Sequence, residues 1–207
     1  LHIYFCDVGQ GDAAYVRFPD GRDMLVDGGP NDKVLNCLGK HMPFWDRAIN
    51  LVVLTHPQKD HMQGLISVLD RYAVDYFVRS DVANDTEGYK KLVEVVERKK
   101  IVQKFVTSGE RIGIGSAALT VLWPSAEQIA KGGGSATARS NLAVNVLGAS
   151  IGDLNDFSVV LWLRYGSFDA LLTGDADTHV EGSYIGTALA PLRQGSEGQA
   201  EFKPYDS

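Results

Sequence analysis

The stretch that decides the fold is Leu51-Val52-Val53-Leu54-Thr55-His56-Pro57-Gln58-Lys59-Asp60-His61. Its first four residues are apolar and branched, which is typical of a strand buried on both faces. Beyond this stretch, apolar residues recur at helical spacing at Met62, Leu65, Ile66 and Leu69. The order is therefore strand, loop and helix. The loop carries two imidazoles and a carboxylate at the carboxyl end of a buried strand, so it predicts a metal site.

The composition is that of an ordinary globular protein. The chain has 207 residues, 44% of them hydrophobic and 22% charged, which fits one domain or two halves that share a core. Its sequence predicts neither a transmembrane segment nor a signal peptide, and its start at Leu1 leads us to expect a piece of a longer protein. The net charge of −6 argues against a broad basic surface for nucleic acid. It does not exclude a nuclease, because bound divalent ions supply a local positive field.

The two cysteines, Cys6 and Cys37, are too few for a disulfide framework or a zinc cluster. Cys6 lies in an apolar segment, so we expect it to be a small core residue and not half of a disulfide. The cysteine content leaves the redox compartment open.

Strand and helix patterns alternate over about the first 110 residues, which predicts α/β layers. Strands are expected at 2–6, 13–18, 24–26, 51–54, 74–78 and 101–106, with further helices at about 32–42 and 86–99. Pro43 is expected to end the first helix, after which Phe44 and Trp45 pack back on the sheet.

From about residue 111 the pattern restarts in β mode. Strands are expected at 112–114, 119–122, 159–163 and 170–172. The segment at about 131–152 is rich in Gly, Ser, Ala and Asn, which predicts a flexible insertion, either a lid or, as the simpler interpretation, a surface loop.

The acidic and histidine residues suit two neighbouring metal ions. Adjacent residues on a turning loop point in different directions, so Asp60 and His61 are suited to different ions. His56 lies far enough upstream to curl back onto the first ion, and Asp175 comes from a separate strand and is placed to bridge both. Such a dinuclear site makes a bound water more acidic and stabilises the attacking and leaving oxygens of a phosphoryl displacement.

Five ordered motifs together resemble one family. They are DVGQGDA at 7–13, VDGG at 26–29, the stretch at 51–61, NDFSVVL at 155–161 and LLTGD at 171–175. This set is similar to the metallo-β-lactamase-fold domain of the ComEC-type competence proteins, the DNA-uptake channel proteins of bacteria. The resemblance implies an α/β (α+β) fold, a four-layer αββα metallo-β-lactamase-like sandwich. It also implies a single domain over residues 1–207, with halves at about 1–110 and 111–207.

The resemblance further implies a metal-dependent phosphodiester hydrolase, a nuclease associated with DNA uptake. Its partner would be single-stranded DNA, and the strand it cuts would be the one that is not imported. A parent protein of this kind carries a membrane channel domain, which would place the chain on the extracytoplasmic face of a bacterial membrane. A hydrolase of small phosphate esters shares every motif, so this alternative stays open.

The metal site is depleted relative to the usual pattern of the superfamily. Gln58 stands where a histidine is usual, and its neutral oxygen suits a hard ion such as Mn or Mg better than Zn. The segment at 192–198 lacks the histidines usual after the acidic strand end, and Glu197 is either a substitute carboxylate or, more simply, a surface residue. The usual third histidine is also absent, with Asn155 and Asp156 near its place.

The predicted metal ligands are His56, Asp60, His61 and Asp175. They are expected to hold one or two divalent ions, Mn or Zn, with Asp60 and Asp175 as the catalytic residues. Further ligands or residues that orient the ligands are expected among Asp12, Asp27, Gln58, Asn155, Asp156 and Glu197. The missing histidines leave a second hypothesis open, a catalytically degenerate binding or structural module with the same fold.

Overall fold

The computed structural model of the protein describes residues 1–132, 153–177, 180, 182 and 201–202. The expected insertion lies outside the described residues from position 133 on, and so does the segment at 192–198 with Glu197. The chain divides into two compact units, Leu1–Arg79 with Ala83–Lys104, and Ser80–Val82 with Phe105–Ser207. That the two halves form a single domain stays a prediction.

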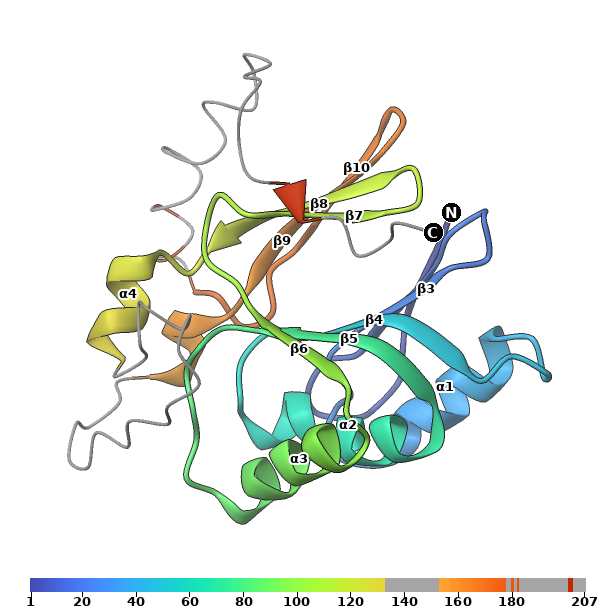
Figure 1. The fold of residues 1–207 in the computed structure, drawn as a ribbon, viewed down its shortest axis with the longest axis horizontal. Helices are drawn as coiled ribbons and strands as arrows, with labels where there is room; N and C mark the ends of the chain where they lie inside the picture. The colour runs from blue at the N-terminus through green and yellow to red at the C-terminus, as the bar shows by residue number, and fades with distance from the viewer. Residues whose placement is uncertain (133–152, 178–179, 181, 183–200, 203–207) are drawn as a thin grey trace. The chain divides into compact units, whose positions relative to one another are not determined.

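The first unit contains a six-stranded sheet in the order β1-β2-β3-β4-β5-β6 (Figure 1). Its strands are β1 (His2–Phe5), β2 (Ala14–Arg17), β3 (Asp23–Val26), β4 (Ala48–Leu54), β5 (Ala73–Arg79) and β6 (Val102–Phe105). The pairs β1–β2 and β2–β3 are antiparallel, whereas β3–β4 and β4–β5 are parallel because helices connect them. The carboxyl ends of β3, β4 and β5 therefore meet at one edge of the sheet.

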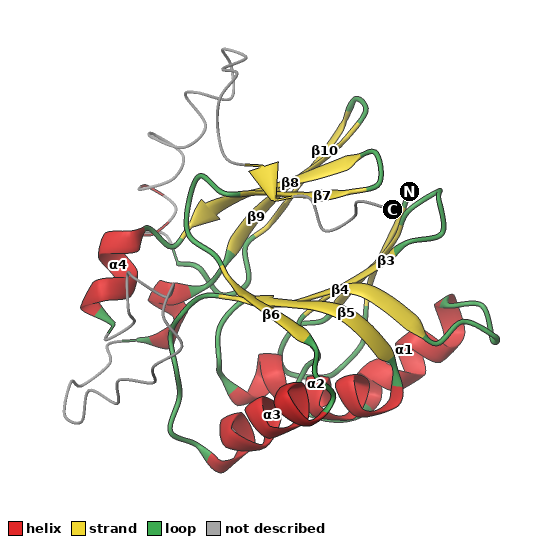
Figure 2. Ribbon diagram, in the orientation of Figure 1, coloured by secondary structure: helices red, strands yellow, loops and turns green. Residues whose placement is uncertain are grey.

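Three helices, α1 (Lys33–His41), α2 (Lys59–Arg71) and α3 (Glu87–Arg98), cover one face of this sheet (Figure 2). Leu38, Leu65 and Leu92, one from each helix, share a core with strand residues such as Val52 and Phe77. The four residues 51–54 are at most 2% exposed, which confirms the expected buried strand. None of the helices in the described part of the chain is long and apolar enough to span a bilayer.

The second unit contains a five-stranded sheet in the order β10-β9-β8-β7-β11. Its strands are β7 (Arg111–Ile114), β8 (Ala117–Trp123), β9 (Val160–Tyr165), β10 (Phe168–Leu172) and β11 (Glu201–Phe202). The strands β7 to β10 pair antiparallel, and β11 is parallel to β7. The four expected strands are confirmed, whereas α4 (Ala126–Lys131) and the 3₁₀ helix η1 (Leu154–Phe157) were not expected.

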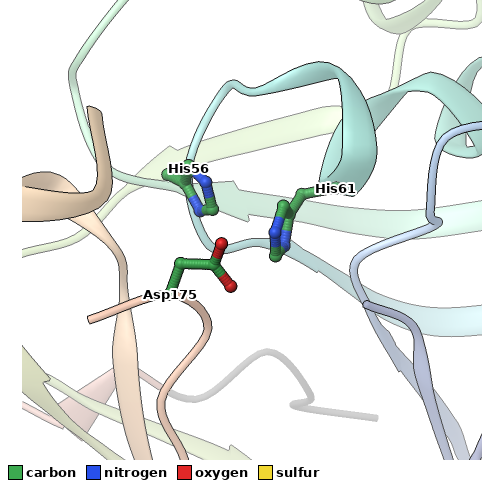
Figure 3. Close-up of side chains that lie close together, drawn as sticks. All are labelled: His56, His61 and Asp175. Carbon is green, nitrogen blue, oxygen red and sulfur yellow. The ribbon is translucent and has the colours of Figure 1, made fainter. Parts of the chain in front are cut away.

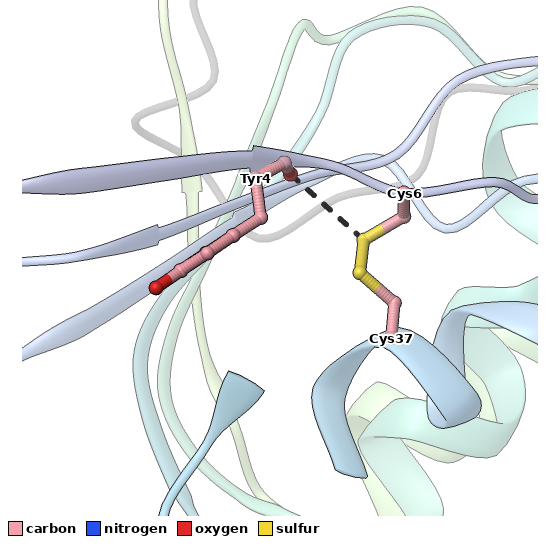
Figure 4. Close-up of a disulfide and its surroundings, with 3 residues drawn as sticks. All are labelled: Tyr4, Cys6 and Cys37. Carbon is pink, nitrogen blue, oxygen red and sulfur yellow. Dashed lines mark hydrogen bonds between the residues drawn. A yellow bond between two sulfur atoms is a disulfide. The ribbon is translucent and has the colours of Figure 1, made fainter. Parts of the chain in front are cut away.

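Cys6 and Cys37 form a disulfide, so the expectation of a free core cysteine was wrong (Figure 4). Cys6 follows β1, Cys37 lies in α1, and their Cα atoms are 5.6 Å apart, an ordinary distance for a disulfide. The two residues are 31 positions apart in the sequence. Only the packing of α1 beneath the end of β1 brings them together, and no local pattern shows this.

The expectation that Phe44 and Trp45 pack on the sheet was also wrong. Their side chains are 82% and 73% exposed. The nearest core residues on either side of them are Met42, directly after α1, and Ile49, in β4.

Removal of the disulfide is expected to lower the free energy of unfolding by about 3 kcal/mol, because it releases a closed loop of 31 residues in the unfolded chain. Urea unfolding of the wild type and of the double variant Cys6→Ser/Cys37→Ser measures the difference. Dithiothreitol should destabilise the wild type and leave the double variant unchanged. Equal stability of the two proteins under oxidising conditions would show that the link contributes nothing.

Candidate metal centre

The histidines of the quoted stretch lie at the edge where β4 ends and α2 begins. His56 follows β4 by two residues and is fully buried, as is His61. Gln58 has extended backbone dihedrals, and its carbonyl accepts hydrogen bonds from His61 N at 3.1 Å and Met62 N at 3.0 Å. The helix therefore begins at Lys59, so Asp60 and His61 lie in its first turn and not on the loop where they were expected. Successive helical residues still point about 100° apart.

Asp27 fixes the ring of His61. It is a buried residue directly after β3, with a left-handed φ of 59°. Its carboxylate accepts hydrogen bonds from Thr55 N at 2.8 Å and Thr55 Oγ1 at 2.6 Å, and lies 2.8 Å from His61 Nδ1. Because an ionised carboxylate only accepts, His61 Nδ1 carries a proton and donates a hydrogen bond to Asp27.

Thr55 connects Asp27 to His56 through its hydroxyl. Since its hydroxyl donates to Asp27, its oxygen is left to accept from His56 Nδ1, which lies 3.1 Å away. Both rings are then held with Nδ1 protonated and with the lone pair on Nε2, the tautomer that binds a metal ion through Nε2. The sequence analysis did not single out Thr55, because its role depends on a carboxylate 28 positions earlier in the chain.

The two rings lie against each other. Their centroids are 4.1 Å apart and the ring planes are inclined by 50° (Figure 3). Their ligand atoms lie within 4.8 Å of each other. The two rings are therefore close enough to offer donors to one ion, and the pair is formed entirely within the first unit.

Burial, with a smaller contribution from the neighbouring His61, lowers the pKa of His56 to about 4. The charges of Asp27 and Asp60 and a hydrogen bond with the Gln58 side chain oppose this effect in part. His56 is therefore neutral at pH 7 and available as an electron-pair donor.

This pKa predicts a loss of stability of the metal-free protein on acidification. Between pH 6.5, the ordinary pKa of histidine, and about 4, the unfolded chain binds a proton at His56 that the folded chain does not. The free energy of unfolding therefore does not depend on His56 above pH 6.5, and it falls by about 2–3 kcal/mol as the pH approaches 4. Urea unfolding of chelator-treated protein tests this, and His56→Asn should lack this part of the pH dependence. An identical pH profile for the variant and the wild type would contradict the assignment.

Two other predicted site residues of the first unit lie in the first turn of α2 and in the loop before β2. Asp60 is half-buried, and a side chain at Gly11 would lie 2.1 Å from its carbonyl oxygen, so the loop before β2 packs directly on this turn. Asp12 in that loop is exposed, and its carbonyl accepts from Gly29 N at 2.9 Å. Asp12 therefore contacts Gly29 through its backbone, and the expectation that its side chain orients a metal ligand stays a prediction.

The remaining predicted residues belong to the second unit. Asn155 and Asp156 lie in η1, where the Asp156 carbonyl accepts from Trp123 Nε1 at 2.7 Å. Asp175 lies on the loop that follows β10 and is half-buried, and its carboxylate is also drawn in Figure 3.

Comparison with known proteins identifies the fold. No family model and no curated protein sequence matches the chain. A metallo-β-lactamase with a HARLDQ motif from Cronobacter sakazakii has a TM-score of 0.50 and 12% identity, over 85% of this chain and 60% of that one. Zn²⁺-bound PqqB from Methylobacterium extorquens has a TM-score of 0.47 and 12% identity, over 77% of this chain and 47% of that one.

A diphosphatase of the PhnP family has a TM-score of 0.37 and 22% identity, over 53% of this chain and 42% of that one. The chain thus spans 60% of the length of the Cronobacter protein and less than half of the other two. The expected α/β fold class is confirmed, and the chain has the metallo-β-lactamase fold.

Proposed function

We propose that the chain is a metal-dependent hydrolase of phosphate diesters and that His56, His61 and Asp175 hold its metal ion. The observation that carries the proposal is the buried imidazole pair, whose Nδ1 atoms are fixed through Thr55 and Asp27. Two imidazoles and one carboxylate form a donor set that suits Zn and Mn. Asp175 offers the carboxylate from the loop after β10, and its place beside the two histidines is part of the proposal.

A divalent ion held by these residues would supply the positive charge that makes a water molecule more acidic and offsets charge on the phosphate. The protein residues have the other roles. Asp27 and Thr55 hold the two imidazole rings, and Asp60, half-buried and next to His61 in the chain, would accept the proton of the water. Asp175 orients the attacking water toward phosphorus.

Gln58 decides how strongly the metal is held. Its side chain hydrogen bonds with His56, so it lies beside the first of the two ring donors. An amide oxygen is a hard and neutral donor, and we therefore propose Mn in preference to Zn. A second candidate function, a metal-free binding or structural module, is favoured by Gln58 itself, because it stands where a histidine is usual and leaves the site with one imidazole fewer.

The proposal extends to single-stranded DNA as substrate and to a position outside the cytoplasm, beside a membrane channel domain of a longer protein. The five motifs shared with the ComEC-type proteins support the substrate. The Cys6–Cys37 disulfide supports the location, because disulfides persist mainly in oxidising compartments.

Metal analysis combined with hydrolysis assays tests the proposal. Chelator-treated protein is loaded with Mn or Zn and assayed on bis(p-nitrophenyl) phosphate, p-nitrophenyl phosphate and a labelled single-stranded oligonucleotide. We expect one or two bound ions and cleavage of the diester and the oligonucleotide. His61→Asn and Asp175→Asn should abolish cleavage, and Gln58→His should tighten metal binding. His41→Asn, at the end of α1, is the matched control and should behave as the wild type.

Three results would contradict parts of the proposal. A metal-free protein that leaves all three substrates unchanged would favour the binding module. Cleavage of the monoester alone would identify a hydrolase of small phosphate esters. Unchanged metal affinity in Asp175→Asn would remove Asp175 from the site.

A further inference from the structure

The turn between α1 and β4 presents two aromatic rings to solvent. Phe44 and Trp45 are 82% and 73% exposed, and their rings pack edge to face with centroids 4.8 Å apart. Two large aromatic side chains in water gain the favourable free energy of burial only if another surface covers them.

The turn is held in place by polar contacts. Asp46 N donates to the Pro43 carbonyl at 2.9 Å, which closes the turn around the two aromatic residues. The Asp46 carboxylate accepts from Ala48 N at 3.2 Å and from Arg17 at 3.4 Å. The backbone therefore fixes both rings outside the core, and the negative charge of Asp46 is paired with Arg17.

The turn lies at the edge of the sheet opposite the histidines. It precedes the first residue of β4, whereas His56 follows the last, and it projects past the sheet in Figure 1. Exposed basic side chains flank it in sequence, Lys40 in the last turn of α1 and Arg47 just before β4. Arg17 is shared between Asp46 at 3.4 Å and Asp23 at 3.0 Å, so the two basic residues Lys40 and Arg47 face one partly neutralised carboxylate at this turn, although the whole chain carries a net charge of −6.

We propose that this turn docks on a lipid bilayer whose headgroups are anionic. Tryptophan and phenylalanine gain from insertion at the interface of a bilayer, and Lys40 and Arg47 complement the charge of the headgroups. A projecting turn enters a deformable bilayer surface directly, whereas a protein partner would need a preformed pocket for both rings. Docking by this edge would leave the histidine edge of the sheet facing away from the bilayer.

Co-sedimentation of the purified chain with vesicles tests this docking. Vesicles of phosphatidylcholine with phosphatidylglycerol should bind the wild type more strongly than vesicles of phosphatidylcholine alone. Phe44→Ala/Trp45→Ala should weaken binding about tenfold or more, and Lys40→Glu/Arg47→Glu should remove the preference for anionic lipid. Phe5→Ala, another exposed aromatic residue of the same unit, is the matched control and should bind as the wild type.

Tryptophan fluorescence measures whether Trp45 enters the bilayer. The emission should shift to shorter wavelength on addition of anionic vesicles, and Trp45→Phe should lose this shift while it still sediments with the vesicles. Equal sedimentation of Phe44→Ala/Trp45→Ala and the wild type would overturn the proposal. It would also be overturned if the double variant lost binding to a single-stranded oligonucleotide, or lost self-association in size-exclusion chromatography, while its vesicle binding stayed unchanged.

Discussion

Replacing Asp27 with asparagine is expected to lower the free energy of unfolding by about 3–5 kcal/mol and to weaken metal binding by about 10- to 100-fold. The carboxylate accepts from Thr55 N, Thr55 Oγ1 and His61 Nδ1, all at 2.8 Å or less. An asparagine side chain has one acceptor oxygen and a donating NH₂ group, so at least one buried donor would face another donor. Asparagine tolerates the left-handed backbone at this position, so backbone strain adds little.

Asp23→Asn is the matched control. Asp23 is equally buried and begins the strand that Asp27 follows, where it accepts from Tyr15 Oη at 2.6 Å and pairs with Arg17 at 3.0 Å. We expect this variant to lose stability and to keep the metal affinity of the wild type. Denaturant unfolding and a competition assay with a chromogenic chelator separate the two effects. Wild-type metal affinity in Asp27→Asn would show that Asp27 does not orient His61.

The elements that sequence predicts best are those with a local pattern. The buried strand ending at Leu54, the helix that follows it and the strands of the second unit were expected from apolar periodicity and are present. The placement of His56 just after the strand follows from the same pattern, whereas His61 was expected on the loop and lies in the first turn of α2.

Features that depend on contacts between distant segments were not predictable in this way. The disulfide and the role of Thr55 both depend on how α1 and the end of β3 pack against residues far away in the chain. Phe44 and Trp45 were expected to pack back on the sheet after Pro43 ends the helix, but a turn closed by Asp46 holds them in solvent. Sequence therefore located the histidine pair and missed the contacts that orient it.

The orientation of His61 relative to Asp27 also depends on a close backbone contact between α2 and the loop after β3. Gly28 N donates to the His61 carbonyl at 2.7 Å, and Gly64 N donates to the Gly29 carbonyl at 2.9 Å. A Cβ atom at Gly64 would lie 2.0 Å from the carbonyl oxygen of Gly28 and 2.5 Å from that of Asn31. Backbone atoms cannot rotate away from such a clash as a side chain does, so the helix itself would have to move.

Gly64→Ala is therefore expected to lower the free energy of unfolding by about 3 kcal/mol or more, although alanine is the better helix former. It should also weaken metal binding, because a shift of α2 separates His61 Nδ1 from Asp27. Gly39→Ala is the matched control in α1, where a Cβ atom meets nothing within 4 Å, and it should stabilise the protein by about 0.5–1 kcal/mol. Denaturant unfolding and chelator competition on both variants test the argument. If Gly64→Ala proved as stable as Gly39→Ala, the close approach of the loop and α2 would not be what positions His61.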